Sequence, residues 1–212
     1  MPRVLLPVGY LTRTRQRGPG PDTVVGMTPA ESSTSRKSPV ATPTVTDKLV
    51  SANRGYAGGF ADPGMDAKPV LRVAVVACMD ARLDLHAALG LELGDCHTIR
   101  NAGGVVTDDT IRSLTISQRA LGTRSVVLIH HTDCGLLRIT EEFRFELEAE
   151  VGQRPAWSVE SFRDLDQDVR QSIRRVETSP FLLHTDDVRG FVFDVRTGLL
   201  REVSAEQITA GD

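Results

Sequence analysis

The stretch VAVVACMDARLDL, residues 73–85, begins with small and β-branched apolar residues and ends in polar ones. The apolar run that leads into it, residues 71–77, is typical of a strand buried on both faces of a parallel sheet. Cys78, Asp80 and Arg82 follow the run directly. A buried structural thiol would explain the cysteine alone, whereas a metal site would also give the carboxylate and the guanidinium a role.

The rest of the chain repeats the alternation of strand and helix. Residues 96–104 and 125–131 are predicted to be strands, and residues 190–195 and 199–203 are predicted to form a final hairpin around an Arg-Thr-Gly turn. This order indicates an α/β fold: a mostly parallel central sheet flanked by helices, with a C-terminal antiparallel strand or hairpin. Ligands of such folds bind at the carboxyl ends of the strands.

The predicted helices differ in how well their ends are marked. Thr107 is placed to cap a helix that Gly122 ends, and residues 83–93 form a helix candidate that Gly90 or Gly94 ends.

Three other helical segments rest on weaker signals. Residues 46–60 are predicted to form a short helix or arm followed by a Gly-rich turn. An apolar stripe over residues 136–151 predicts a helix beneath an acidic face, and Ser158 is expected to cap the helix after it.

Composition excludes several classes of protein. Hydrophobic residues make up 40% and charged residues 25% of the 212-residue chain, and the net charge is -3 at pH 7. These values fit a globular protein and give no reason to expect binding to nucleic acid or to an anionic membrane. No apolar run approaches the roughly 20 residues that span a bilayer. Three cysteines, an odd number, argue against a disulfide framework and favour a reducing compartment, so we expect a cytoplasmic protein.

The N-terminal part differs in composition from the rest. Seven of the 11 prolines precede residue 44, and residues 1–46 carry six basic residues but only two acidic ones. We interpret residues 1–44 as a disordered extension and residues 45–212 as one folded domain. The extension lacks the apolar segment of a secretory signal, and a start codon placed too far upstream, with Met27 as another start, is the favoured interpretation.

Metal-capable residues follow two of the buried-type strands. The first strand leads to Cys78, and the third leads to His131 and, three positions on, Cys134. Neighbouring parallel strands lie less than about 5 Å apart, so the three side chains can reach one point. Two thiolates and an imidazole suit Zn2+, and three ligands leave the fourth tetrahedral position vacant, as a catalytic site requires.

Asp80 and Arg82 leave two arrangements open. Strand-like alternation from Cys78 would point residues 78, 80 and 82 the same way. Asp80 can then be the fourth zinc ligand, or it can pair with Arg82 and leave that position to water.

These motifs together resemble the β-class carbonic anhydrases, above all the compact branch found in archaea and mycobacteria. CMDAR (78–82) and HTDCG (131–135) match the two-part family signature, and RNAGG, DDTIRSLTISQRALG and FVFDVRTGLL match its flanking stretches. The resemblance covers residues from about 45 to 205.

The resemblance implies a site and a reaction. Cys78, His131 and Cys134 would hold one Zn2+ per subunit, and Asp80 with Arg82 would form the catalytic dyad. The family implies reversible hydration of CO2 to bicarbonate by zinc-bound hydroxide, and a homodimer or higher homo-oligomer. In some members the aspartate ligates zinc at lower pH, so we hypothesise that Asp80 opens and closes this site with pH.

Two other functions and two local questions remain open. The same zinc site would also serve a carbonyl sulfide or carbon disulfide hydrolase, and a permanent Asp80 ligand would make a non-catalytic zinc module.

His130 stands where the family commonly has glycine, and a core or interface histidine is favoured over a proton shuttle. The Ala-Gly-Gly turn at 102–104 is either an anion site or a tight packing corner.

Overall fold

The computed structural model describes residues 42–204. Most of the predicted disordered extension, residues 1–41, lies outside the described residues, as do residues 205–212. The chain divides into two units, Met1–Phe60 and Ala61–Asp212.

The described part of the first unit is one helix, α1 (Val45–Gly59). A capping box begins it: Thr44 Oγ1 accepts from Asp47 N at 3.1 Å, and an Asp47 oxygen accepts from Thr44 N at 2.8 Å. The predicted Gly-rich turn is wrong, because the helix continues to Gly59. Glycine weakens a helix by only about 1 kcal/mol per residue, and the Tyr56 and Phe60 rings, one turn apart with centroids 5.5 Å apart, support the last turn.

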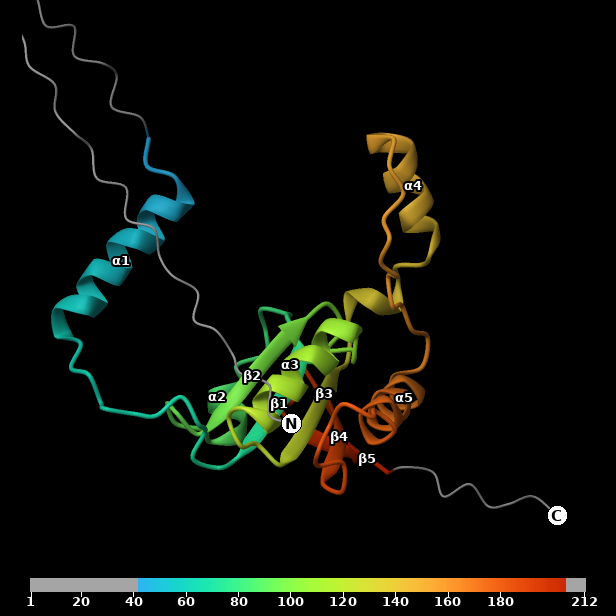
Figure 1. The fold of residues 1–212 in the computed structure, drawn as a ribbon. Coiled ribbons are helices and arrows are strands. Elements are labelled where there is room, and N and C mark those ends of the chain that lie inside the picture. Colours follow the sequence, from blue (N-terminus) through green and yellow to red (C-terminus); the bar gives the residue numbers. More distant parts are fainter. Residues whose placement is uncertain (1–41, 205–212) are drawn as a thin grey trace, which may run out of the picture. The chain divides into compact units, whose positions relative to one another are not determined.

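The second unit is built on a five-stranded sheet (Figure 1). Its strands are β1 (Val73–Cys78), β2 (Cys96–Asn101), β3 (Ser125–His131), β4 (Val188–Phe193) and β5 (Leu200–Val203). They lie in the order β2-β1-β3-β4-β5, and all neighbours are parallel except the β4–β5 pair. The predicted fold class is confirmed. Because β1 and β3 are parallel neighbours, their carboxyl ends lie at the same edge of the sheet.

Four helices of this unit are α2 (Leu85–Leu89), α3 (Asp108–Arg119), α4 (Glu142–Val151) and α5 (Leu165–Glu177). Thr107 caps α3 as predicted, and Gly90 follows α2 in the left-handed conformation. Within residues 42–204, no helix is long and apolar enough to cross a membrane.

Two helix predictions are wrong. The stripe over residues 136–151 is not one helix: a short 3-10 turn covers Gly135–Leu137, α4 begins at Glu142, and none of its residues is buried. Asp164, not Ser158, caps α5 and accepts from Gln167 N at 2.9 Å. Asp164 has the glutamine three residues on that suits a capping box, whereas Ser158 has a serine there.

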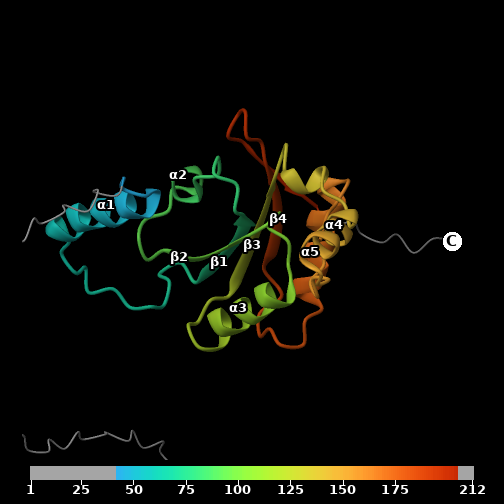
Figure 2. The same cartoon turned by 90° about the horizontal axis from the view of Figure 1, so that it is seen from above.

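Helices α3 and α5 lie on the same face of the sheet (Figure 2), and apolar side chains pack on both faces. On one face Val76 and Leu128 pack with Leu114 of α3 and Val169 of α5. On the other face Ile129 belongs to a cluster that includes Cys78 and Cys134. Successive strand residues therefore alternate between a helix-covered core and the cluster that holds the thiols.

Candidate metal centre

Three side chains meet at the carboxyl ends of β1 and β3. The two sulfur atoms of Cys78 and Cys134 and a ring nitrogen of His131 all lie within 4.8 Å of one another. The three residues are 4%, 2% and 0% exposed, in that order. The structure thus brings together the three candidate ligands that the strand ends predicted, and it buries them.

The backbone beside Cys78 is held from strand β2. Arg100 donates from Nε and Nη2 to the Cys78 carbonyl, at 2.9 and 2.8 Å, and from Nη2 to the Asp80 carbonyl at 2.7 Å. Met79 N donates to Asn101 O at 2.8 Å. These bonds fix the first residues after β1, so the Cys78 side chain leaves the sheet from a defined position.

The Ala-Gly-Gly turn closes against the same place. Gly104 has φ +73, and a Cβ there would lie 2.7 Å from Cys78 N and 2.8 Å from Ile129 O. Any side chain would therefore collide with the backbone of both β1 and β3. Of the two interpretations of this turn, the structure supports the tight packing corner.

His131 presents one ring nitrogen to the two thiols. Its Nδ1 lies 2.9 Å from Thr132 O, which makes Nδ1 the donor, so the neutral ring has its lone pair on Nε2. Nε2 is buried, and among residues 42–204 no hydrogen-bond partner satisfies it. A buried nitrogen without a partner is costly, and a cation between the sulfurs and this nitrogen would satisfy it.

The protonation of the two thiols also suits a cation. A hydrogen bond from Cys134 lowers the pKa of Cys78 well below the usual thiol value, although burial opposes the shift. The same bond, with burial, raises the pKa of Cys134. Burial alone would lower the pKa of His131, but the Cys78 sulfur, the Thr132 carbonyl and the Asp80 carboxylate together raise it. Cys78 is the first thiolate, and a divalent cation would displace the proton that remains on Cys134.

Asp80 and Arg82 pair with each other beside this cluster. Asp80 Oδ1 accepts from Arg82 N and Nε, both at 2.9 Å, and Asp80 Oδ2 accepts from Nη2 at 2.8 Å. The predicted strand-like alternation of residues 78, 80 and 82 is wrong, because β1 ends at Cys78 and residues 81–82 form a turn. The turn brings Asp80 and Arg82 together instead. The Arg82 bonds hold the pKa of Asp80 well below its usual range, and Asp80 in return raises the pKa of Arg82.

Arg82 also contacts the loop between His131 and Cys134. It donates from Nη1 to Asp133 Oδ2 and from Nη2 to Asp133 O, both at 3.1 Å. Asp133 has φ +56 and also accepts from Arg138. Sequence reasoning missed Asp133, although an acidic residue between two metal-capable residues was a usable signal.

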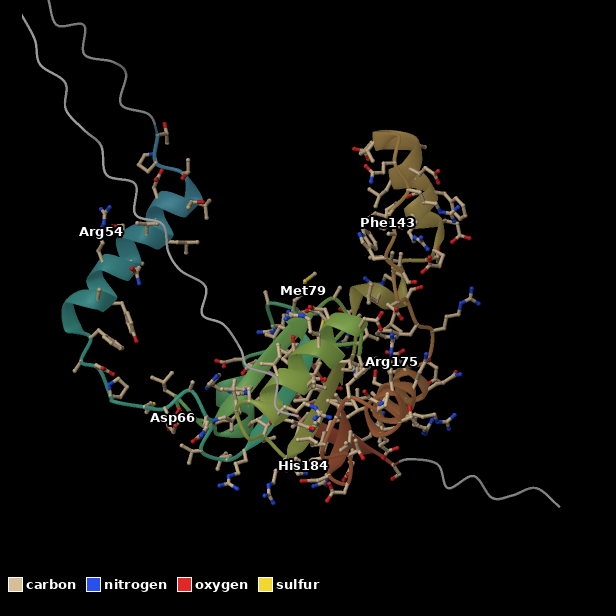
Figure 3. The ribbon with its side chains drawn as sticks, viewed as in Figure 1. Arg54, Asp66, Met79, Phe143, Arg175 and His184 are labelled. Atoms are coloured by element: carbon tan, nitrogen blue, oxygen red, sulfur yellow. The ribbon has the colours of Figure 1, made fainter. Side chains whose placement is uncertain are left out.

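Asp80 is the carboxylate next to the cluster. Its Oδ2 lies 3.8 Å from His131 Nε2, while its side chain is 20% exposed. Met79, beside Cys78, is exposed at the end of the sheet from which α4 extends (Figure 3). Because it is close to His131 Nε2 and partly exposed, the Asp80 carboxylate lies between this buried nitrogen and solvent.

Cys96, His97 and His130 lie outside the cluster. His97 Nδ1 lies 2.7 Å from Ser117 Oγ, and Cys96 contacts Thr98. His130 is fully buried on the opposite face of β3 from His131, with Nε2 2.6 Å from Asp168 Oδ2.

Known proteins resemble this chain in sequence and in fold. A family model described as carbonic anhydrase matches residues 73–200. Beta-carbonic anhydrase 1 of Mycobacterium tuberculosis is 54% identical over 162 residues, which cover 76% of this chain and 99% of that protein. A carbon disulfide hydrolase of Acidithiobacillus thiooxidans is 31% identical over 152 residues, 61% of this chain and 76% of that protein.

A solved structure gives the same result. The carbonic anhydrase of Streptococcus mutans superimposes with a TM-score of 0.72 at 40% identity, covering 77% of this chain and 100% of that one.

Proposed function

The chain belongs to the β-carbonic anhydrase family, and we propose that Cys78, His131 and Cys134 hold one Zn2+ with which it hydrates CO2 reversibly. The observation that carries the metal assignment is the buried, unpartnered Nε2 of His131 beside two thiol sulfurs. Two thiolates and one imidazole are the donors that zinc prefers, and they leave room for a further ligand. Zinc bound there would lower the pKa of a water molecule toward 7 and so supply the nucleophile for CO2.

Asp80 would orient that water. Arg82 keeps Asp80 ionised, so the carboxylate can accept a hydrogen bond but has no proton to donate at working pH. A water held by this bond would present its other lone pairs to the carbon of CO2. Arg82 takes up both oxygens of Asp80, so it also restrains the carboxylate from binding the metal.

A released Asp80 would become the fourth protein ligand, because it is the carboxylate 3.8 Å from His131 Nε2. We propose that this closed arrangement forms at lower pH, where hydroxide no longer competes for the position. Asp80 itself need not titrate, since its pKa already lies below its usual range. A permanently closed, non-catalytic zinc module is disfavoured, because Arg82 engages both Asp80 oxygens.

Carbon disulfide hydrolysis is the second candidate. It is favoured by the 31% identity to a carbon disulfide hydrolase, and it would use the same metal and the same dyad. Carbonyl sulfide belongs to the same substrate class.

One set of assays separates these functions. We expect zinc-loaded protein to hydrate CO2 in a stopped-flow assay at pH 8.5, and to release little sulfide from carbon disulfide or carbonyl sulfide in parallel. Hydration at the uncatalysed rate by protein that holds one zinc per chain would reject the assignment. Faster sulfide release than CO2 hydration would favour the second candidate.

We also propose that the protein is a homodimer or a higher homo-oligomer. Helix α1 buries none of its residues and exposes an apolar set: Val45, Leu49, Val50, Tyr56 and, at its end, Phe60. Such a set on a single helix suits burial against a second copy. Light scattering should give at least twice the 23.1 kDa chain mass, and Leu49→Glu should lower it.

Two broader assignments go with this function. We propose that residues 45–212 form the catalytic domain and residues 1–44 an extension to it. We place the protein in the cytoplasm, because Cys78 and Cys134 are free thiols that must stay reduced to bind metal. Deletion of residues 1–41 should leave zinc content and CO2 hydration unchanged.

A further inference from the structure

A buried polar pair lies behind the metal cluster, on the other face of β3. His130 is fully buried, and Asp168 is 9% exposed. The His130 Nε2 to Asp168 Oδ2 distance is 2.6 Å, short for a hydrogen bond between nitrogen and oxygen. A buried carboxylate needs such a partner, so the pair is a strong link between β3 and α5.

Close packing brings helix α5 to this position. Gly190 of β4 faces α5, and a Cβ there would lie 2.3 Å from Val169 Cγ1 and 2.8 Å from Ile173 Cδ1. The missing side chain lets α5 lie directly on the sheet, which carries the Asp168 carboxylate to the neighbouring strand.

The His130 ring has little freedom in this place. It lies against Phe162, with ring centroids 5.5 Å apart, and its Nε2 is held by Asp168. Its Nδ1 has no hydrogen-bond partner within residues 42–204. Asp168 is thus the one polar contact that the described structure gives this ring.

The pair acts on the residue that carries a proposed ligand. His130 and His131 are consecutive, and strand geometry sends their side chains to opposite faces. A bond that fixes His130 therefore also fixes the peptide from which the His131 ring extends. Metal sites tolerate ligand displacements of only about 0.2 Å, so this backbone position matters to metal binding.

We propose that His130 and Asp168 are a positioning pair that sets the place of His131 Nε2 relative to the Cys78 and Cys134 sulfurs. The proposal rests on the proposed metal site at these three residues. It differs from a merely structural role, in which the pair would stabilise the fold and leave the metal affinity of the folded protein unchanged.

The test compares three variants of the full chain. Asp168→Leu removes the bond, and Asp168→Asn keeps an amide oxygen that can accept from His130 Nε2. Asp166→Leu is the matched control: Asp166 also ties α5 to the sheet, through Arg201 of β5 at 2.6 Å, but it does not reach β3. Each variant is checked for folding by circular dichroism and is then titrated with Co2+ and, by chelator competition, with Zn2+.

We expect Asp168→Leu to weaken Zn2+ binding about tenfold or more, and to alter the cobalt–thiolate absorption bands. Asp168→Asn should weaken binding less, and Asp166→Leu should match the wild type. A folded Asp168→Leu protein with wild-type affinity and bands would overturn the proposal. If Asp168→Leu does not fold, Asp168→Asn decides: unchanged affinity and bands would overturn the proposal, and a measurable loss would support it.

Failure of the metal site itself gives a different result. If the wild-type chain binds neither Co2+ nor Zn2+, the proposed function fails together with this inference. If the wild type binds both metals and the Asp168 variants bind them equally well, the positioning role alone fails.

Discussion

The metal-facing triad (Cys78, His131 and Cys134) and the Asp80–Arg82 pair lie side by side but are held differently. The triad is buried and comes from strand ends or the residues just after them, where backbone bonds and a glycine corner fix its positions. The pair lies in a turn, with Asp80 and Arg82 side chains 20% and 45% exposed. Buried groups on strands are held in one arrangement, whereas exposed groups in a turn can exchange partners.

This difference assigns separate tasks to the two regions. A metal ligand must stay in place, so its supports are rigid. The proposed exchange of Asp80 between Arg82 and a metal requires a carboxylate that can move, and the bonds that hold Asp80 are polar and near solvent. Damage to the triad should therefore abolish metal binding, whereas damage to the pair should change activity with little effect on the fold.

The largest effect should come from removing one member of the triad. Cys134→Ser replaces a thiolate with a hydroxyl group that binds zinc poorly. If the total binding energy of a zinc site is about 10–16 kcal/mol shared equally among its three protein ligands, affinity should fall roughly two to four powers of ten. Metal analysis after dialysis should find little zinc in Cys134→Ser, and the CO2 assay should give the uncatalysed rate. The matched control Cys96→Ser, which lies outside the cluster, should keep its zinc and its activity. Full zinc content in Cys134→Ser would contradict the assignment.

The second effect tests the rigid support of the triad. Gly104→Ala places a methyl group against Cys78 N and forces alanine into a positive φ, so we expect about 2–4 kcal/mol of destabilisation and a loss of zinc affinity. Gly122→Ala is the control, because Gly122 also has a positive φ, +77, but no atom of residues 42–204 lies within 4 Å of the added Cβ. It should cost only about 1 kcal/mol and leave zinc binding intact. Equal unfolding free energies in urea for the two variants would show that the corner is not tightly packed.

The third effect falls on the pair. Arg82→Ala releases Asp80, which should then bind the metal and lower CO2 hydration about 10- to 100-fold near pH 7. Stability should change little, since solvent screens the pair. Arg112→Ala, which removes the exposed Arg112–Asp109 pair at 2.7 Å, should leave activity unchanged. Wild-type activity and an unchanged pH profile in Arg82→Ala would show that Arg82 does not restrain Asp80.

The smallest effect concerns pH and stability. The folded pKa of Asp80 lies below its unfolded value of about 3.9, so its stabilising contribution is complete above that value. The contribution is lost as pH falls through the lower folded pKa. The difference in unfolding free energy between the wild type and Arg82→Ala should thus be constant from pH 5 to 9. A difference that fades between pH 7 and 5 would show that Asp80 titrates in the working range.

The strand-end part of the site could be predicted from local pattern. Two continuous apolar runs placed Cys78 and His131 at the ends of neighbouring strands, and parallel strands end at one edge of the sheet. The α3 cap at Thr107 was equally clear, because its signal lies within one turn of chain.

Features that depend on tertiary contacts could not be predicted. Arg100 reaches Cys78 and Asp80 from 20 or more residues away, and Asp133 meets Arg82 only because β1 and β3 are adjacent. Asp168 is an ordinary polar residue on a helix until Gly190 brings that helix onto the sheet. The meeting of Asp80 and Arg82 was expected for the wrong reason, since a turn rather than a strand brings them together.

The most direct test is a crystal structure of the zinc-loaded protein at pH 8.5, with anomalous data at the zinc edge. We predict one zinc bound by Cys78 Sγ, His131 Nε2 and Cys134 Sγ, with Asp80 still bonded to Arg82. Zinc at any other set of residues, or Asp80 in the coordination sphere with Arg82 displaced at this pH, would contradict it.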